Sequence, residues 1–323
     1  MIENKKILII GGTGALGRTL TNRYLTHAGN KIKILSRDEQ KHVTLMTSTY
    51  KDTPNVSFII GDVKDKNSLT NAIETFKPHI VINTAALKHV HICETNSIES
   101  VKVNILGNQN LIDVVQSANH RIETLIFVST DKACKPLNIY GMCKSISERL
   151  YIDFSKKQTD IKVCLVRFGN LLESTGSVIP FFKKLLESGA KYLPITDKRM
   201  TRFLISLNQA VDVIDWAYNT SGTHGKIAIP NLKSFLITDV AKVLINSYLG
   251  SEDSIPLSYI GIRKGEKLHE EMISTEEWFR TEEREYFLIG DEIIRNDTKS
   301  YNSLDYLMNK EDVEKFFKEQ KVI

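Results

Sequence analysis

The chain has few cysteines, little net charge and no long apolar run, and each shortage argues against a class of protein. Four cysteines are scattered over 323 residues without a CxxC pair, which favours reduced thiols over a disulfide framework. A formal net charge of +4 gives no broad attraction for nucleic acid. No apolar run is long enough for a signal peptide or a membrane span. We therefore expect a cytoplasmic protein with no nucleic-acid partner and no membrane partner.

Metal-ligating residue types are also sparse. His89, His91 and Cys93 stand two apart, which is compatible with a metal site, but the sequence offers them no distant partner cluster. The basic pairs at 156–157 and 183–184 lie in segments patterned like ordinary solvated helices. We expect no metal.

The first half does contain a regular alternation of short apolar runs and helical patterns. Strands this apolar are buried on both faces, which predicts an α/β fold with a doubly wound parallel sheet of the Rossmann type. Apolar positions at helical spacing predict the helices between them. The expected strands lie at 7–10, 32–35, 56–60, 79–82, 125–128 and 161–166. The expected helices lie at 15–27, 68–76, 98–118 and 140–156.

The second half is less regular. Helices are expected at 176–188, 208–218 and 239–248, the last with Thr238 as its N-cap. The charged tail after Asp297 is either a partner-binding arm or a solvated helix docked on the surface, and we favour the docked helix.

A glycine-rich segment, GGTGALG, follows the first expected strand and opens a helix. Its glycines allow a tight turn and a close approach of pyrophosphate to the backbone, and the helix N-terminus favours an anion. This context predicts a dinucleotide site. Its expected contacts are Gly11, Thr13, Gly14, Ala15, Leu16 and Gly17.

The residues after the second strand distinguish NAD from NADP. An NAD site usually has an acid there for the ribose diol, whereas this chain first places Ser36 and Arg37. A hydroxyl and a planar cation suit a 2′-phosphate, so we expect NADP, although Asp38 leaves NAD open. Loops after the third and fourth strands complete the site. The further expected contacts are Ser36, Arg37, Asp38, Lys41, Asp62, Val63, Ala85 and Ala86.

Titratable residues concentrate after the fifth expected strand, in STDKACKPLNIYGMCK at 129–144. Tyr140 and Lys144 are four apart at the start of a helix and therefore share a face. A tyrosine, with a pKa near ~10, is a poor base at neutral pH. A nearby ammonium together with an oxidised nicotinamide would lower that pKa. Tyr140 would then take a proton from a substrate hydroxyl while hydride leaves for the cofactor.

With these motifs the chain resembles the extended short-chain dehydrogenase/reductases and, within them, the inverting UDP-N-acetylglucosamine 4,6-dehydratases (C5-epimerising). The resemblance spans nearly the whole chain, and RFGNLLESTGSVIPFFKKLLESG, PITDKRMTRFLI and GIRKGEKLHEEMI are its most specific segments. It implies a hydro-lyase with tightly bound NADP that is recycled in each turnover. The implied substrate is UDP-N-acetylglucosamine, the implied product a UDP-2-acetamido-2,6-dideoxy-4-keto-hexose for surface glycans, and the implied assembly a homo-oligomer.

The resemblance gives roles to Asp131 and Lys132. Retaining dehydratases carry Asp-Glu at this place, and simple 4-epimerases lack the pair. Once C4 is a ketone, the C5 proton is acidic. We expect Asp131 to protonate the departing C6 hydroxyl if burial raises its pKa, and Lys132 to remove the C5 proton if Lys144 or desolvation lowers its pKa. Without the resemblance, an ion pair at a loop tip explains the two residues equally well.

Further contacts follow from the same resemblance. Asn170 matches a diphosphate-sugar contact, Leu171 a cofactor contact, and Lys88 a residue shared between cofactor and substrate. The other expected substrate contacts are Thr130, Val178, Thr196, Arg202, Arg263 and Glu266, and Asn104 is a further expected cofactor contact. One departure is Thr175, which stands where the family often has an arginine and puts in doubt the affinity for UDP or the identity of the sugar.

We expect an NADP-binding Rossmann domain over residues 1–168 and a smaller α/β lobe for the UDP-sugar over 169–323, with some segments returning to the first domain. Other functions stay open at this point. A UDP-sugar 4-epimerase or a retaining nucleotide-sugar 4,6-dehydratase could use the same fold, but the pair Asp131 and Lys132 argues against both. A non-enzymatic NADP-binding sensor would have no need of Tyr140 and Lys144.

Overall fold

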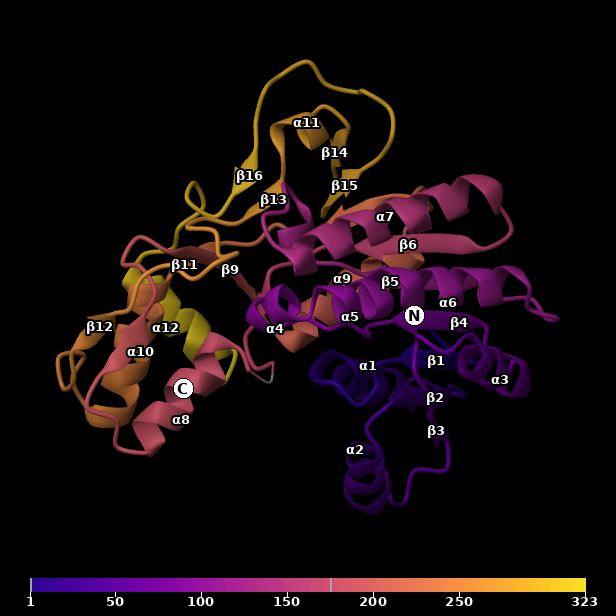
Figure 1. Ribbon diagram of the computed structural model, residues 1–323, viewed down its shortest axis with the longest axis horizontal. Helices are drawn as coiled ribbons and strands as arrows, with labels where there is room; N and C mark the ends of the chain where they lie inside the picture. Colours follow the sequence, from indigo (N-terminus) through magenta and orange to yellow (C-terminus); the bar gives the residue numbers. More distant parts are fainter. Residues whose placement is uncertain (1, 175) are drawn as a thin grey trace.

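The computed structural model describes residues 2–174 and 176–323, and in this part of the chain nine strands form one sheet (Figure 1). The strand order is β14-β15-β10-β6-β5-β4-β1-β2-β3, with parallel pairing from β3 to β10 and antiparallel pairing of β15 and β14. The chain reverses its direction of travel across the sheet between β1 and β4, which is where such sheets bind ligands. The bounds are β1 Lys6–Ile10, β2 Lys31–Ser36, β3 Val56–Ile60, β4 Ile80–Asn83, β5 Thr124–Val128, β6 Lys162–Val166, β10 Ile227–Ile229, β14 Thr281–Glu283 and β15 Phe287–Ile289.

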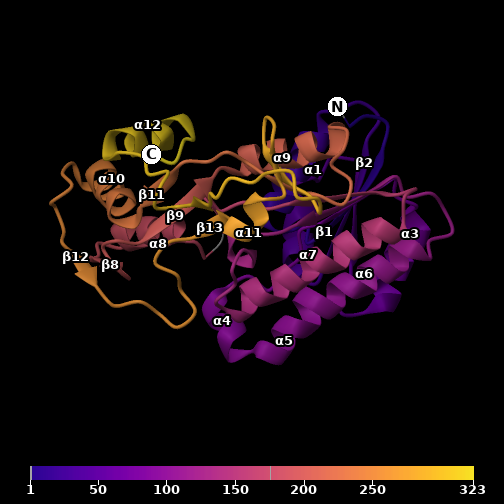
Figure 2. The ribbon, with the colours of Figure 1, turned by 90° about the horizontal axis from the view of Figure 1, so that it is seen from above.

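Helices cover both faces of this sheet (Figure 2). One face carries α1 and α9, which pack on each other, and the opposite face carries α3, α6 and α7. This layering confirms the doubly wound α/β fold and explains the near-continuous apolar strands. The bounds are α1 Ala15–Leu25, α2 Glu39–Thr44, η1 Leu45–Thr49, α3 Lys66–Phe76, α4 Val90–Thr95, α5 Ser97–Val101, η2 Lys102–Leu106, α6 Gly107–Gln116, η3 Asp131–Ala133, α7 Ile139–Lys157 and α9 Leu207–Asn219.

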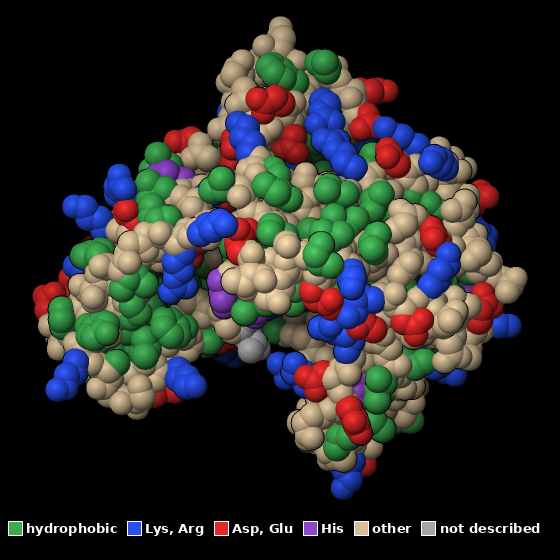
Figure 3. All heavy atoms as spheres, viewed as in Figure 1, with side chains coloured by type: hydrophobic (Ala, Val, Ile, Leu, Met, Phe, Trp, Pro, Cys, Tyr) green, Lys and Arg blue, Asp and Glu red, His purple; other side chains and the backbone are tan. Residues whose placement is uncertain are grey.

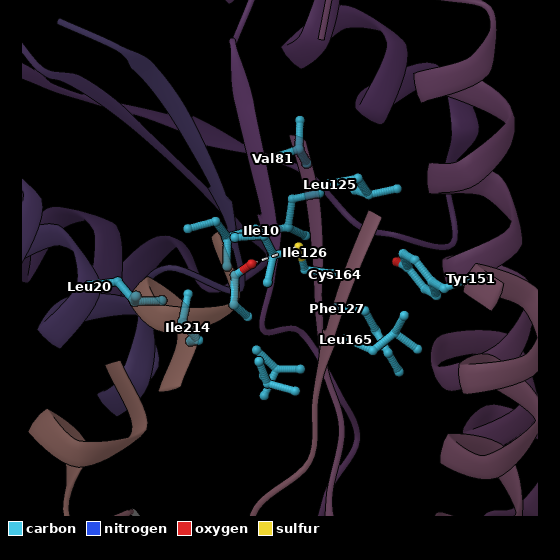
Figure 4. Packing of buried hydrophobic residues seen from close by; sticks show 14 of the residues in the cluster. Ile10, Leu20, Val81, Leu125, Ile126, Phe127, Tyr151, Cys164, Leu165 and Ile214 are labelled. Atoms are coloured by element: carbon cyan, nitrogen blue, oxygen red, sulfur yellow. Dashed lines mark hydrogen bonds between the residues drawn. The ribbon is translucent and has the colours of Figure 1, made fainter. Parts of the chain in front are cut away.

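The core under α7 fixes the strand that leads to the titratable segment (Figure 4). Phe127 of β5 stacks on Tyr151 of α7, with ring centroids 4.4 Å apart. The Tyr151 hydroxyl donates to Oδ1 of Asn108 at 2.9 Å, so its polar end is also satisfied. Burying one such aromatic side chain contributes roughly 1.5–3 kcal/mol. The end of β5 and the start of α7 are therefore held in a defined relation.

The expected helix at 98–118 is interrupted by a wider turn. It divides into α5, the π-helical turn η2 and α6. Asn104 lies in η2, and its side chain donates to and accepts from the backbone of Leu87, both at 2.9 Å. Single π-turns are frequent at functional sites, and this one holds the loop that follows β4.

A second lobe with its own hydrophobic cluster lies beside the carboxyl edge of the sheet, on the left of Figure 1. The helices α8, α10 and α12 pack together there. The bounds are β7 Asn170–Leu171, α8 Val178–Glu187, β8 Leu193–Ile195, β9 Thr201–Ile205, β11 Ser234–Leu236, α10 Ile237–Leu249, β12 Leu257–Tyr259 and α12 Lys310–Glu319. Three further elements, β13 Glu271–Ile273, α11 Thr275–Trp278 and β16 Tyr301–Asn302, pack against the core of the large sheet instead.

Segments from the second half of the chain also join the large sheet, because β10, β14 and β15 extend it and α9 covers it. A division at 168/169 stays a prediction. One helix start was wrong: α10 begins at Ile237 with Leu236 at the N-cap position, so Thr238 lies inside the helix. The reason is tertiary. Leu236 pairs with Thr201 in the sheet, and the chain passes directly from strand to helix.

The charged tail ends in α12, which confirms the docked-helix alternative. Val313 and Phe317 are fully buried in the second cluster, and the ring of Phe316 lies 5.2 Å from that of Phe235. Within the described ranges, no helix combines the length and apolarity that crossing a membrane requires.

Candidate active site

A cleft of about 1220 Å³ lies between the carboxyl edge of the sheet and the second lobe, where Figure 3 shows a hollowed surface. Loops after β1 to β5 line one side, and residues of α8, β9 and the segment before β13 line the other. Almost all the expected site residues line this cleft. The exceptions are Asp131, which lies behind Thr130 and Lys132, and Asn104, whose amide is occupied by the backbone of Leu87. Thr175 lies outside the described residues.

The glycine loop forms one end of the cleft. Gly11 has a φ of +77°, and a Cβ there would lie 2.8 Å from the backbone of Ala85, so only glycine fits this turn. Gly14 is at the N-cap position of α1, and the first turn of that helix carries no acidic residue. The exposed backbone N–H groups and the helix dipole suit a pyrophosphate. The residues present therefore fit a dinucleotide.

The end of β2 is organised by a buried chain of polar groups. Thr13 Oγ1 donates to Ser36 Oγ at 3.0 Å, and that hydroxyl lies 2.6 Å from Nε2 of His42. Burial lowers the pKa of His42, which favours its neutral ring. His42 was not expected from the sequence, since it lies in a polar helical turn with no distinguishing pattern.

The carboxylate of Asp38 is already occupied. It caps α2 by accepting from the backbone N–H of Lys41 at 3.0 Å, and it pairs with Lys41 Nζ at 2.9 Å. Arg37 is more than half exposed at the same edge and lies 3.8 Å from Asp62. Arg37, Asp38 and Lys41 thus lie together at this edge of the cleft.

Tyr140 and Lys144 lie in the first turns of α7. Asn138 caps this helix by accepting from the Gly141 N–H at 2.8 Å. A Cβ at Gly141 would lie 2.2 Å from the carbonyl oxygen of Lys132, so glycine lets α7 approach η3 closely. That contact brings the phenol of Tyr140 beside the turn that carries Asp131.

Burial shifts the pKa values of both Tyr140 and Lys144. Lys144 Nζ donates to the carbonyl of Val128 at 2.7 Å and lies 4.4 Å from the ring centroid of Phe127. Burial lowers the pKa of Lys144 to about 7. Burial also raises the pKa of Tyr140, and the charge of Asp131 adds to that rise. In the protein alone Tyr140 is thus a protonated phenol, and the lowering of its pKa by the oxidised nicotinamide stays a prediction.

Asp131 is a buried acid. Its Oδ1 accepts from Thr130 Oγ1 at 2.8 Å and from Lys132 Nζ at 3.0 Å, whereas its buried Oδ2 has no hydrogen-bond partner among the described residues. Burial raises the pKa of Asp131, the direction expected for a general acid.

Lys132 lies between three acceptors. Its Nζ donates to Oδ1 of Asp131 and to Oδ1 of Asn170, both at 3.0 Å, and lies 3.3 Å from Oε1 of Glu270. Burial lowers the pKa of Lys132, but the carboxylates of Asp131 and Glu270 outweigh burial and raise it overall. The expected lowering is therefore wrong, because the two carboxylates in contact with the ammonium outweigh both burial and the opposing charge of Arg202.

Glu270 and a second buried network escaped sequence reasoning. Glu270 is only two residues before the apolar pair 272–273, and nothing but its adjacency to another acid marks it. Behind the site, Arg167 is 1% exposed and pairs with Glu148 at 2.7 Å and with Glu277 at 2.8 Å. Ser129 donates to Glu148 at 2.6 Å, which ties the end of β5 to this network.

Residues of the second lobe close the cleft. The guanidinium of Arg202 donates to the backbone carbonyls of Thr201, Lys267 and Leu268, so it organises the segment before β13. Arg263 is exposed at the cleft, and its N–H donates to the carboxylate of Glu266 at 3.2 Å. Across residues 2–174 and 176–323, no group of three or more His, Cys, Asp and Glu side chains could hold a metal ion.

Comparison with known proteins places this arrangement in a family. Residues 7–291 match the model of the polysaccharide biosynthesis protein family. The chain is 44% identical over 300 residues to a UDP-N-acetylglucosamine 4,6-dehydratase (inverting) of Campylobacter jejuni, covering 91% of this chain and 85% of that protein. It is 33% identical to a UDP-glucose 4-epimerase of Rickettsia rickettsii, covering 90% and 84%. The X-ray structure of Pen from Bacillus thuringiensis superimposes with a TM-score of 0.90 at 29% identity, covering 99% of each chain.

The match of a family model to most of the chain agrees with the Rossmann sheet, the glycine loop and the Tyr140/Lys144 helix. The chain belongs to the polysaccharide biosynthesis protein family and, within the extended short-chain dehydrogenase/reductases, to the same family as the inverting UDP-N-acetylglucosamine 4,6-dehydratases.

Proposed function

We propose that this protein is an inverting 4,6-dehydratase of UDP-N-acetylglucosamine that retains NADP. The product is a UDP-2-acetamido-2,6-dideoxy-4-keto-hexose, a precursor of deoxy-aminosugars in surface glycans. The observation that carries the proposal is that Tyr140 and Lys132 line one cleft together with a dinucleotide-binding loop, and that the buried acid Asp131 is hydrogen-bonded to Lys132 directly behind it. The name of the Campylobacter relative supports the same reaction.

The residues of the loop at 11–17 would hold the pyrophosphate, and Arg37 and Lys41 would bind the 2′-phosphate. The bound nicotinamide supplies a reversible store for one hydride. The chain itself supplies orientation: Lys144 is anchored on the Val128 carbonyl beneath the cleft, and Tyr140 is held next to η3. Because Tyr140 has a raised pKa in the protein alone, its activation depends on the positive charge that arrives with the oxidised cofactor.

The dehydration step uses Asp131 and Lys132, the two titratable residues of η3. Oxidation of the substrate at C4 makes its C5 proton acidic, and loss of the C6 hydroxyl needs a proton donor. We assign that role to Asp131, because burial raises the pKa of its carboxyl group in the direction that a proton donor needs. Lys132, in its amine form, takes the C5 proton, and the ammonium that results stabilises the enolate that forms at the C4 oxygen and C5. Return of the stored hydride to C6 together with protonation of C5 from the opposite face would give the inverted 6-deoxy product.

The decisive experiment incubates the purified protein with UDP-N-acetylglucosamine in D₂O and follows the proton spectrum. We expect a new C6 methyl signal, deuterium at C5 and couplings that report the inverted configuration. Tyr140→Phe should remove this signal, and Tyr192→Phe, at an exposed tyrosine outside the cleft, is the matched control. Unchanged substrate with the parent protein contradicts the proposal.

A UDP-sugar 4-epimerase is the second candidate, and the named Rickettsia relative favours it. Asp131 and Lys132 argue for dehydration, because an epimerase has no leaving group to protonate. Mass spectrometry separates the two: a dehydratase product is lighter than its substrate by one water, and an epimerase product has the same mass. A retaining dehydratase would give the methyl signal with the original C5 configuration. For a non-enzymatic sensor, Tyr140→Phe would leave every measured property unchanged.

A homo-oligomer is part of the same proposal. Apolar side chains are exposed on neighbouring helices α5, η2 and α7, and Figure 3 shows apolar side chains gathered over α7. These residues are Ile98, Leu106, Met142 and Ile146. A second copy packing the same helices against them would bury both patches at once, which suits a two-fold interface. Light scattering should give at least a dimer, and Ile98→Glu with Ile146→Glu should give monomers; a monomeric parent contradicts this part.

A further inference from the structure

Glu270 lies beside Lys132 in the lining of the cleft. Its side chain is 3% exposed and lines the cleft, and its backbone is fixed by a hydrogen bond from its N–H to Ser303 Oγ at 2.8 Å. The carboxylate approaches three cations: Oε1 lies 3.3 Å from Lys132 Nζ and 3.8 Å from Arg202 Nε, and Oε2 lies 4.0 Å from Lys267 Nζ. Oε2 is buried and accepts no hydrogen bond from the described residues.

Resting on the proposed function, we propose that Glu270 is a positioning residue of the dehydration site. It serves as the ionised counterion of Lys132, which leaves Asp131 protonated as the general acid. The geometry supports this division, because one ammonium contacts both carboxylates but only Glu270 is also close to Arg202 and Lys267. Asp131, with Oδ2 unpartnered and fully buried, has no second cation within ion-pair distance.

The charges facing each carboxyl group agree with this assignment. Burial raises the pKa of Glu270, but Lys132, Arg202 and Lys267 outweigh burial and lower it. For Asp131, burial raises the pKa, Lys132 opposes the rise, and the negative charge of Glu270 adds to it. Thr130 donates to the same Asp131 oxygen as Lys132 does, and Tyr140 faces the pair as a neutral phenol.

A site with one carboxylate beside Lys132 would have to ionise that carboxylate to balance the ammonium. A site with two carboxylates and one ammonium can keep one of them protonated, because two like charges at such short range repel. The two carboxyl groups then lose their protons one after the other. Because Arg202 and Lys267 face Glu270, Glu270 should ionise first. Removing the charge of Glu270 should therefore move the ionisation of Asp131 to lower pH.

The first test is a carbon-13 NMR titration of the side-chain carboxyl groups in the full-length, cofactor-loaded protein, with Asp131→Asn and Glu270→Gln spectra giving the assignments. In the parent, Glu270 should ionise at lower pH than Asp131. In Glu270→Gln, the midpoint of Asp131 should fall by about one pH unit or more. Glu271→Gln is the matched control, since Glu271 is adjacent and bonds the exposed Lys135 outside the cleft; its Asp131 midpoint should not move.

The second test is the pH dependence of kcat. If Asp131 must be protonated, Glu270→Gln should move the alkaline limb to lower pH, whereas Glu270→Asp, which keeps the charge, should retain most of the parental profile. A lower kcat with an unmoved limb in Glu270→Gln indicates a merely structural role and overturns the inference. So does a parent in which Asp131 ionises before Glu270, and one folded variant, Asp131→Asn or Glu270→Gln, is enough to assign that order.

The two proposals can fail separately. Should no dehydration be found while the midpoint of Asp131 still falls in Glu270→Gln, the proposed function is wrong and the coupling of the two carboxyl groups stands. Should dehydration be found with an Asp131 midpoint that is the same in Glu270→Gln and in the parent, the proposed function stands and the role given to Glu270 is wrong.

Discussion

Two lysines, Lys132 and Lys144, line the cleft, but their surroundings are opposite. Lys144 has a backbone carbonyl and an aromatic ring beneath it, and its pKa falls to about 7. Lys132 lies against Asp131 and Glu270, and its pKa rises. Burial acts in the same direction on both. The carboxylates in contact, and not burial alone, therefore decide which lysine is charged at neutral pH.

The largest expected effect on activity should separate the role of Lys132 from that of Lys144. Lys132→Met should reduce formation of the C6 methyl group by roughly 10²–10⁴-fold, because the group that handles the C5 proton is lost. It should still permit C4 oxidation, seen as absorbance of the reduced nicotinamide. Lys144→Met should suppress both signals, and Lys184→Met, on the exposed face of α8, neither. Equal losses of the methyl signal and the nicotinamide absorbance in Lys132→Met would show that Lys132 and Lys144 do not have separate roles.

Arg167 lies in the buried network behind the site, and its removal should cost stability rather than chemistry. Arg167→Met leaves Glu148 and Glu277 buried without their cation, which should lower the free energy of unfolding by about 3–5 kcal/mol. Arg199→Met breaks an exposed pair with Asp197 and should cost no more than about 1 kcal/mol. Urea unfolding of both variants checks the contrast; similar losses would show that the buried network is not special.

The lowered pKa of Lys144 predicts a pH-dependent stability. In the folded protein its pKa is about 7, and in the unfolded chain it is ordinary, near ~10.4. Below about pH 7 the folded protein bears the full cost of a buried charge, and from there to about pH 10 that cost disappears as folded Lys144 loses its proton. Lys144→Met should thus be more stable than the cofactor-free parent by roughly 1–4 kcal/mol at low pH, with a gap that closes on the alkaline side. Urea unfolding at several pH values tests this, and a constant gap would contradict it.

The smallest effect concerns the far end of the cofactor site, where the charges are exposed. Arg37→Ala should weaken NADP binding about tenfold and leave NAD binding nearly unchanged, because the arginine would meet only the 2′-phosphate. Calorimetric titration of cofactor-stripped protein gives both affinities. Arg121→Ala, at an exposed arginine away from the cleft, is the control. Equal weakening of both cofactors would favour NAD as the natural ligand.

The sequence by itself determined the α/β layering and the place of the site. The six apolar runs are the strands β1 to β6 to within a residue or two, because a strand buried on both faces must be apolar throughout. The glycine loop and the pair Tyr140/Lys144 were equally visible, since their spacing is local. The loop follows the carboxyl end of β1 and the pair follows that of β5. These two parallel strands are separated only by β4, so the fold brings the two motifs to the same edge of the sheet.

Only the tertiary structure decided the charges. Glu270 reaches Lys132 across 138 positions of the chain, so no local spacing could reveal that the ammonium has two carboxylate neighbours. For the same reason the expected direction of the shift in the Lys132 pKa was wrong. The start of α10 was also decided by a distant contact, because the strand pairing of Leu236 with Thr201 places that start before Thr238. A pKa depends on every group within a few ångströms, and those groups come from strands and loops that only folding makes neighbours.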